Sequence, residues 1–235
     1  MSSNKQILTI DLDYIMEPCI QLYNSKISEL SSHKQSWDRI FNENKCQPFL
    51  SINEDNRDFI VDIITKSKCP IYIGLDHTSI LRMFDDLYND DENLSPPFEI
   101  INIDHHHDCG YDPESTKRII EYKYAQCGNW VELLHQEKLI SKYTWVKNPN
   151  SILPKVKSNI VSIIDQDTFI NEYAENNYYA LYITPSFNWI PPQFLPAVYN
   201  ILTIAENQET FKQFYTAYYE QYKTQMQYYI YKWSK

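Results

Sequence analysis

The segment Asp104-His-His-His-Asp108 places five ionisable side chains directly after the apolar run Ile100 to Ile103. Burying carboxylates and imidazoles together is costly because each group loses its water, and a bound divalent metal is the simplest compensation. In extended backbone Asp104, His106 and Asp108 alternate with period two, so their side chains would share one face. Carboxylate and imidazole ligands suit Mn²⁺, or less often Fe²⁺ or Zn²⁺, better than they suit a thiolate-rich zinc site.

Three histidines besides His106 could take part in this candidate site. His77 follows the apolar run 71–73 by a few residues, which makes it the fourth predicted metal ligand. His105 and His107 would point away from the face that carries the ligands. They are predicted to orient those ligands or to contact a substrate.

Two Asp-x-Asp pairs compete to complete the ligand set. A site for two metal ions roughly 3.5–4 Å apart needs about six protein ligands, of which the four residues above supply the larger part. Asp11 and Asp13 follow the apolar run 7–10, and their mutual repulsion favours a cation between them. Asp165 and Asp167 follow a second apolar run in the same way. The sequence favours Asp11 and Asp13 and leaves the other pair open.

Apolar runs alternate with helical patterns along the whole chain, which predicts a single α/β domain over residues 1–235. We expect three layers around a mostly parallel sheet, with strands near 7–10, 71–73, 98–103, 143–146, 160–164 and 179–184. Helices are expected near 55–66, 79–88 and 129–137. Ligands of such sheets bind at the carboxyl ends of the strands, where all the candidate residues lie.

The C-terminal segment, about 193–235, is predicted to be helical and is rich in tyrosine. Aromatic residues recur at helical spacing from Phe211 to Trp233, a pattern typical of a helix that packs its aromatic face on the body. The alternative is that this face contacts a second copy in a homo-oligomer.

Composition narrows the classes of partner. A net charge of −10 argues against nucleic acid and is compatible with a cationic substrate such as a guanidinium or an amine. No apolar stretch of membrane length and no signal peptide are apparent, so no membrane association is expected. Five cysteines without a CxxC motif favour free thiols in a reducing compartment. These features predict a soluble, cytoplasmic protein.

Four short segments resemble motifs of the arginase and ureohydrolase superfamily. Residues 104–108 resemble the family's Asp-Ala-His-x-Asp, and residues 74–79 its Gly-Gly-Asp-His-Ser. Residues 127–129, Cys-Gly-Asn, resemble its Ser-Gly-Asn substrate loop. Residues 9–18 are similar to its Ser-x-Asp-x-Asp-x-x-Asp-Pro segment, although here this segment comes first, which implies a permuted strand order. The early Asp-Leu-Asp-Tyr and the Cys-Gly-Asn-Trp look most like the peptide arginases.

That resemblance implies an enzyme that binds two Mn²⁺ ions and hydrolyses arginine side chains of a ribosomally made precursor peptide to ornithine and urea. The resemblance also implies that Asp108 holds the hydroxide and passes its proton to the leaving amine. The implied metal ligands are Asp11, Asp13, His77, Asp104, His106 and Asp108. Asn129 and one or both of Asp165 and Asp167 would position the substrate.

The chain departs from that family at two functional positions. Arginases carry a histidine two residues after Gly-Asn that relays protons, and here Val131 occupies its place. The glutamate that grips guanidinium in arginases has no clear counterpart either. An enzyme that acts on a peptide and not on a free amino acid is expected to lack part of this recognition.

Two functions of other kinds remain as alternatives. A mono-zinc amide deacetylase on the same scaffold would use one Asp-His-Asp set and adjacent histidines as acid and base. His106 and His107 fit that pattern, which makes His107 the second candidate catalytic residue. The other alternative is a non-catalytic protein that binds peptides and uses its metal for stability.

Overall fold

The structure, a computed structural model, describes residues 5–17, 37–38, 42, 50–91, 94–110, 114, 117, 121, 125–151, 159–212, 223–224 and 227. Seven strands build its main sheet: β1 (Gln6–Asp11), β4 (Ile71–Ile73), β5 (Phe98–Asp104), β6 (Ile140–Lys147), β7 (Val161–Ile164), β8 (Ala180–Thr184) and β9 (Phe211–Lys212). Their order is β7-β6-β5-β1-β8-β4-β9, and every neighbouring pair is parallel. The predicted α/β fold with a mostly parallel sheet is confirmed.

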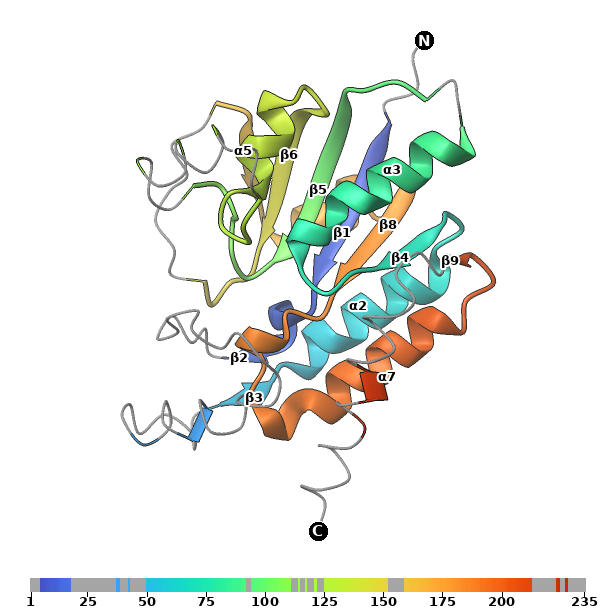
Figure 1. Ribbon diagram of the computed structural model, residues 1–235. Coiled ribbons are helices and arrows are strands. Elements are labelled where there is room, and N and C mark those ends of the chain that lie inside the picture. Colours follow the sequence, from blue (N-terminus) through green and yellow to red (C-terminus); the bar gives the residue numbers. More distant parts are fainter. Residues whose placement is uncertain are drawn as a thin grey trace.

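Helices cover both faces of this sheet and make three layers (Figure 1). One face packs against α2 (Glu54–Lys66), α6 (Gln166–Glu172) and α7 (Leu195–Glu206). The other face packs against α3 (Ile80–Asp90) and α5 (Trp130–Gln136). Because both faces are covered, the central strands β1, β5 and β8 are buried at almost every position, as is typical of parallel sheets.

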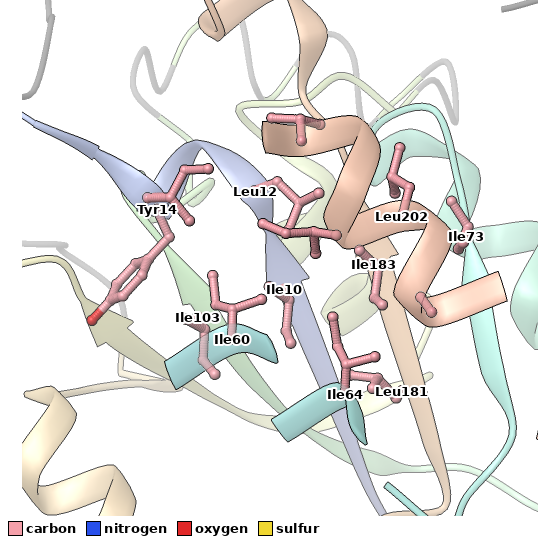
Figure 2. Packing of buried hydrophobic residues seen from close by; sticks show 14 of the residues in the cluster. Ile10, Leu12, Tyr14, Ile60, Ile64, Ile73, Ile103, Leu181, Ile183 and Leu202 are labelled. Atoms are coloured by element: carbon pink, nitrogen blue, oxygen red, sulfur yellow. The ribbon is translucent and has the colours of Figure 1, made fainter. Parts of the chain in front are cut away.

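The core between the sheet and helices α2 and α7 is built from aliphatic side chains (Figure 2). Ile60 and Ile64, one turn apart on α2, and Leu202 of α7 face the strands and are at most 1% exposed. Burying each such side chain contributes about 1.5–3 kcal/mol. Helix α2 begins where the Asn53 side chain accepts a hydrogen bond from the backbone N–H of Asn56 at 2.9 Å.

The register of the central strands sets the position of the candidate site. Four isoleucines stand side by side across β5, β1, β8 and β4 and point into the core just described: Ile103, Ile10, Ile183 and Ile73. Since side chains alternate along a strand, the next residue of each strand points to the opposite face. That next row is Asp104, Asp11, Thr184 and Gly74. Two acidic groups are therefore aligned at the carboxyl edge, on the side of the sheet covered by α3 and α5.

The C-terminal segment is helical over α7, as predicted, but its aromatic part begins differently from the prediction. Phe211 and Lys212 form strand β9 beside β4 and are not the start of a helix, so this part of the helix prediction was wrong. The edge of β4 explains the difference, because its backbone groups need partners: the N–H of Ile71 donates to the carbonyl of Thr210 at 3.0 Å. Most of the remaining aromatic stripe lies outside the described residues.

Short elements complete the description. Strands β2 (Met16–Glu17) and β3 (Ser51–Ile52) pair antiparallel as a small separate sheet that the sequence did not predict. Within the described residues, loops contain four 3₁₀ helices: η1 (Leu12–Ile15), η3 (His77–Ser79), η4 (Phe187–Trp189) and η5 (Pro192–Phe194). No described helix has the length and apolar character needed to cross a bilayer.

Replacing Gly74 by alanine is expected to destabilise the fold beside the site. A Cβ at Gly74 would lie 1.8 Å from the Tyr182 hydroxyl oxygen, which donates a hydrogen bond to the carbonyl of Asp76 at 2.6 Å. Forcing an extra methyl group into a packed site costs about 1–3 kcal/mol, and urea denaturation measures the loss. Tyr182→Phe, which removes only the hydrogen bond, is the control. A Gly74→Ala protein as stable as the wild type would contradict the close packing.

Candidate metal centre

Two groups of acidic and histidine side chains that can hold a metal ion meet at the carboxyl edge of the central strands. One group contains Asp11, His77 and Asp104, and the other contains Asp13, Asp104 and His106. Within each group the potential ligand atoms all lie within 4.8 Å of one another. Asp104 belongs to both, so its carboxylate lies between two candidate positions for a cation.

The two oxygens of Asp104 face different imidazoles. Its Oδ2 lies 3.8 Å from Nδ1 of His77, and its Oδ1 lies 3.8 Å from Nδ1 of His106. The Oδ1 atom also accepts a hydrogen bond from the backbone N–H of His106 at 2.7 Å. The local backbone therefore fixes the orientation of the shared carboxylate.

A tight turn after β1 delivers Asp11 and Asp13 together. Asp11 caps helix η1, and its Oδ1 accepts a hydrogen bond from the N–H of Asp13 at 3.0 Å. Asp13 Oδ1 in turn accepts the N–H of His105 at 3.4 Å, which links this turn to the loop after β5. Asp13 Oδ2 lies 2.8 Å from Nδ1 of His106. The Asp-x-Asp spacing thus supplies one carboxylate to each group.

Asp108 completes the cluster from the loop that follows β5. Its backbone has φ = 51°, a left-handed conformation that is uncommon for residues other than glycine. Its Oδ2 lies 3.0 Å from Nδ1 of His77 and accepts a hydrogen bond from Nε1 of Trp130 at 2.7 Å. The structure therefore brings together all six predicted metal ligands.

Burial makes this cluster electrostatically costly without a cation. Asp11, Asp13 and Asp104 are at most 4% exposed. Burial, reinforced by the neighbouring Asp13, raises the pKa of Asp11 to about 8, and burial also raises the pKa of Asp104 well above its usual value. Asp11 and Asp104 then hold protons that a bound metal would replace.

The buried carboxylates also change the pKa values of the neighbouring imidazoles. Burial alone would lower the pKa of His106, but the neighbouring Asp13 carboxylate raises it to about 9. Burial alone would also lower the pKa of His77, but Asp108, Asp11 and Asp13 together raise it. Oxygen and nitrogen donors without a thiolate ligand, held in two groups that share one carboxylate, fit hard or borderline divalent cations. The residues present therefore fit a metal centre.

Several residues that the sequence did not single out hold the ligands in place. Asn102, two residues before Asp104 on the same face of β5, donates from Nδ2 to Asp104 Oδ2 at 2.8 Å. Thr9 of β1 donates in turn to Asn102 Oδ1 at 2.5 Å. Ser186, in the loop after β8, donates to Asp11 Oδ2. A polar residue inside an otherwise apolar strand was the one signal available for Asn102.

The other two histidines of the triplet are neutral and buried. His107 is 3% exposed, its Nδ1 accepts the N–H of Cys109 at 3.1 Å, and burial lowers its pKa to about 4. His105 is 2% exposed, burial likewise lowers its pKa to about 4, and neither ring nitrogen has a hydrogen-bond partner among the described residues. Neither belongs to the two metal-binding groups, as predicted for residues of the opposite face.

Asn129 and the second Asp-x-Asp pair occupy different surroundings. Asn129 Oδ1 accepts the N–H of Gln126 at 2.6 Å, while its buried Nδ2 has no hydrogen-bond partner in the described part of the chain. Asp165 and Asp167 are exposed at the end of β7, the edge strand three places from β1. Asp165 caps α6 by accepting the N–H of Thr168 at 2.8 Å. The structure places this pair outside both metal-binding groups and Asp11 and Asp13 inside them.

Comparison with known proteins gives no assignment. No family model matches the chain, and neither the curated proteins nor the solved structures yielded a match.

Metal affinity should distinguish the two Asp-x-Asp pairs. Replacing residues that merely support a ligand typically weakens metal binding about 10–100-fold, so Asp13→Asn, which alters a proposed ligand, is expected to lose at least that much. Asp167→Asn is the matched control, because this exposed side chain lies outside both groups. Isothermal titration with Mn²⁺ measures both. Equal affinity of the two variants would contradict the proposed ligand set.

The metal-free protein should lose stability as pH rises from about 6.5 to 8.5. Asp11 and His106 have folded-state pKa values of about 8 and 9, above the ordinary values of 3.8 and 6.5 for these side chains, so folding favours their protonated forms. That contribution is lost as pH rises through the folded pKa values. Added Mn²⁺ should stabilise the protein more strongly at the higher pH, because the cation replaces these protons. Melting temperatures with chelator and with Mn²⁺ test this; no dependence on pH in the chelated protein would contradict it.

Proposed function

We propose that this chain is a metal-dependent hydrolase of the arginase type that converts arginine residues of a precursor peptide into ornithine residues and urea. The observation that carries the proposal is the position of Asp104, whose carboxylate is shared by two groups of metal-binding side chains. Two cations about 3.5–4 Å apart are the arrangement used by many hydrolases. The resemblance of the four sequence segments to peptide arginases supports the choice of a guanidino substrate.

The proposed cofactor is a pair of Mn²⁺ ions. His77, Asp11 and Asp108 would hold one ion and Asp13 and His106 the other, with Asp104 between them. Such ions supply Lewis acidity that lowers the pKa of a water, so that hydroxide is available near neutral pH.

The residues of the chain then have separate tasks. Asp108 would hold the attacking hydroxide, accept its proton and pass that proton to the amine that leaves the guanidinium carbon. Asn129, whose Nδ2 has no hydrogen-bond partner among the described residues, would help to orient the substrate. A net charge of −10 favours the approach of a cationic side chain.

The geometry gives less support to the deacetylase alternative. That reaction needs His107 as an acid or base in contact with substrate. Its ring is instead buried near Trp145, with ring centroids 5.6 Å apart, and its Nδ1 is occupied by the backbone N–H of Cys109. A group in this position exchanges protons with a substrate poorly, which favours the guanidino hydrolase.

Release of urea tests the proposal. Purified protein loaded with Mn²⁺ is expected to release urea from Arg-containing peptides, and Asp108→Asn is expected to slow the reaction about 10²–10⁴-fold, the usual contribution of a proton-transfer group. Asp85→Asn, at an exposed position of α3 on the same side of the sheet, is the matched control and should retain the wild-type rate.

Each outcome of this assay separates one function from the others. Urea from peptides but not from free arginine supports a peptide arginase, whereas urea from free arginine indicates a small-molecule ureohydrolase. Zinc-dependent amide hydrolysis without urea would favour the deacetylase. Peptide binding that survives chelation, with no turnover before it, would favour the non-catalytic binder. No urea from any Arg-containing peptide contradicts the proposal.

A further inference from the structure

We infer that Trp130 is a positioning residue of the metal centre, and that its single indole ring sets the orientation of both Asp108 and His77. The inference rests on the metal centre of the proposed function, but it does not depend on the substrate. None of the sequence motifs discussed above assigns a role to this tryptophan.

The first contact is a hydrogen bond to a carboxylate. Nε1 of Trp130 donates to Oδ2 of Asp108 at 2.7 Å, and the two residues are 1% and 6% exposed. An indole N–H can only donate, so this bond requires an acceptor oxygen at that position. Hydrogen bonds to a carboxylate are stronger than those between neutral groups, and burial from water strengthens them further. The bond therefore fixes which oxygen of Asp108 faces the tryptophan.

The second contact is a stack on the metal-binding imidazole. The rings of Trp130 and His77 have centroids 4.8 Å apart and planes inclined by 20°. This stack sets the plane of the imidazole, and in that plane Nδ1 of His77 lies 3.0 Å from the same Asp108 oxygen. His77 and Asp108 lie on different loops, and the indole ring of Trp130 contacts both. The ring thereby holds Nδ1 of His77 close to Oδ2 of Asp108.

The indole is itself held rigidly. Trp130 is the first residue of α5, and its ring meets the edge of Tyr143 of β6 at 5.8 Å and 80°. Just before the helix, the carbonyl of Gly128 accepts the N–H of Gly110 at 2.7 Å, which ties this loop to the loop that carries Asp108. A residue with packed surroundings on a helix terminus is suited to define a ligand position.

The backbone of Asp108 makes such an anchor necessary. Its backbone conformation, with φ = 51°, has a higher free energy than the conformations usual for residues other than glycine. Surrounding contacts must offset this cost. The hydrogen bond from Trp130 is a contact that holds the side chain of this residue directly. Without the indole N–H, Asp108 would have more than one orientation, and the metal would have to order it on binding.

The test compares two substitutions of buried indole donors. Trp130→Phe keeps an aromatic ring over His77 but removes the N–H. Trp145→Phe is the matched control, since Trp145 is also 1% exposed and its Nε1 donates at 2.9 Å to the backbone carbonyl of Asp104 and not to a carboxylate. Titration with Mn²⁺ gives the affinity, the visible absorption of the Co²⁺-loaded proteins reports ligand geometry, and urea denaturation gives fold stability.

Trp130→Phe is expected to weaken Mn²⁺ binding about 10–100-fold, as is typical for residues that orient metal ligands, and to change the Co²⁺ spectrum. Trp145→Phe is expected to lose comparable fold stability with a smaller loss of affinity. Unchanged Mn²⁺ affinity and an unchanged Co²⁺ spectrum in Trp130→Phe would overturn the inference and leave the metal centre in place. A wild-type protein that binds no metal would instead overturn the centre itself.

A measurement on the wild-type protein keeps the inference testable if Trp130→Phe does not fold. In ¹⁵N-labelled protein, the assigned indole N–H resonance of Trp130 is expected to shift when Zn²⁺ is added, because the charge on its acceptor changes. A Trp130 indole resonance that stays constant while Zn²⁺ binds would overturn the inference.

Discussion

The cost of burying several carboxylates together is the constraint on which the rest of the site depends. Asp11, Asp13 and Asp104 are almost completely enclosed, and Asp108 is 6% exposed. Such groups must hold protons, pair with cationic side chains or bind a metal. In the metal-free chain, protons on the carboxylates and the imidazoles of His77 and His106, whose pKa values are raised, compensate the negative charge in part. A divalent cation between the carboxylates would compensate it more completely, and this is the physical basis of the proposed metal centre.

The parallel sheet supplies the precision that such a centre needs. Strand pairing aligns Asp11 and Asp104 in one row, and the helices on both faces keep these strands from shifting. The turns that follow β1 and β4 add Asp13 and His77, each fixed by local hydrogen bonds or packing. Ligands attached to strand ends are held more accurately than ligands on long loops, which favours a site of defined geometry.

The sequence predicted the features that depend on residues close to one another along the chain. Apolar runs predicted the central strands, and the Asp and His residues that follow them include the six that meet in the structure. Five of these lie in the two metal-binding groups, and Asp108 lies beside His77. The choice between Asp11 and Asp165 needed the strand order, because both pairs follow an apolar run. Asp11 ends β1, which lies beside β5, whereas Asp165 follows β7 at the edge of the sheet. Trp130 and Ser186 were missed because their partners are distant in sequence. Strand β9 was missed because helical spacing does not reveal an open sheet edge.

Anomalous diffraction from Mn²⁺-soaked crystals would show directly whether two cations bind on either side of Asp104. Two anomalous peaks about 3.5–4 Å apart are expected. One should lie against His77, Asp11 and Asp108, the other against Asp13 and His106. A single peak would contradict the paired centre and favour a mononuclear site, and no peak at these residues would contradict the account as a whole.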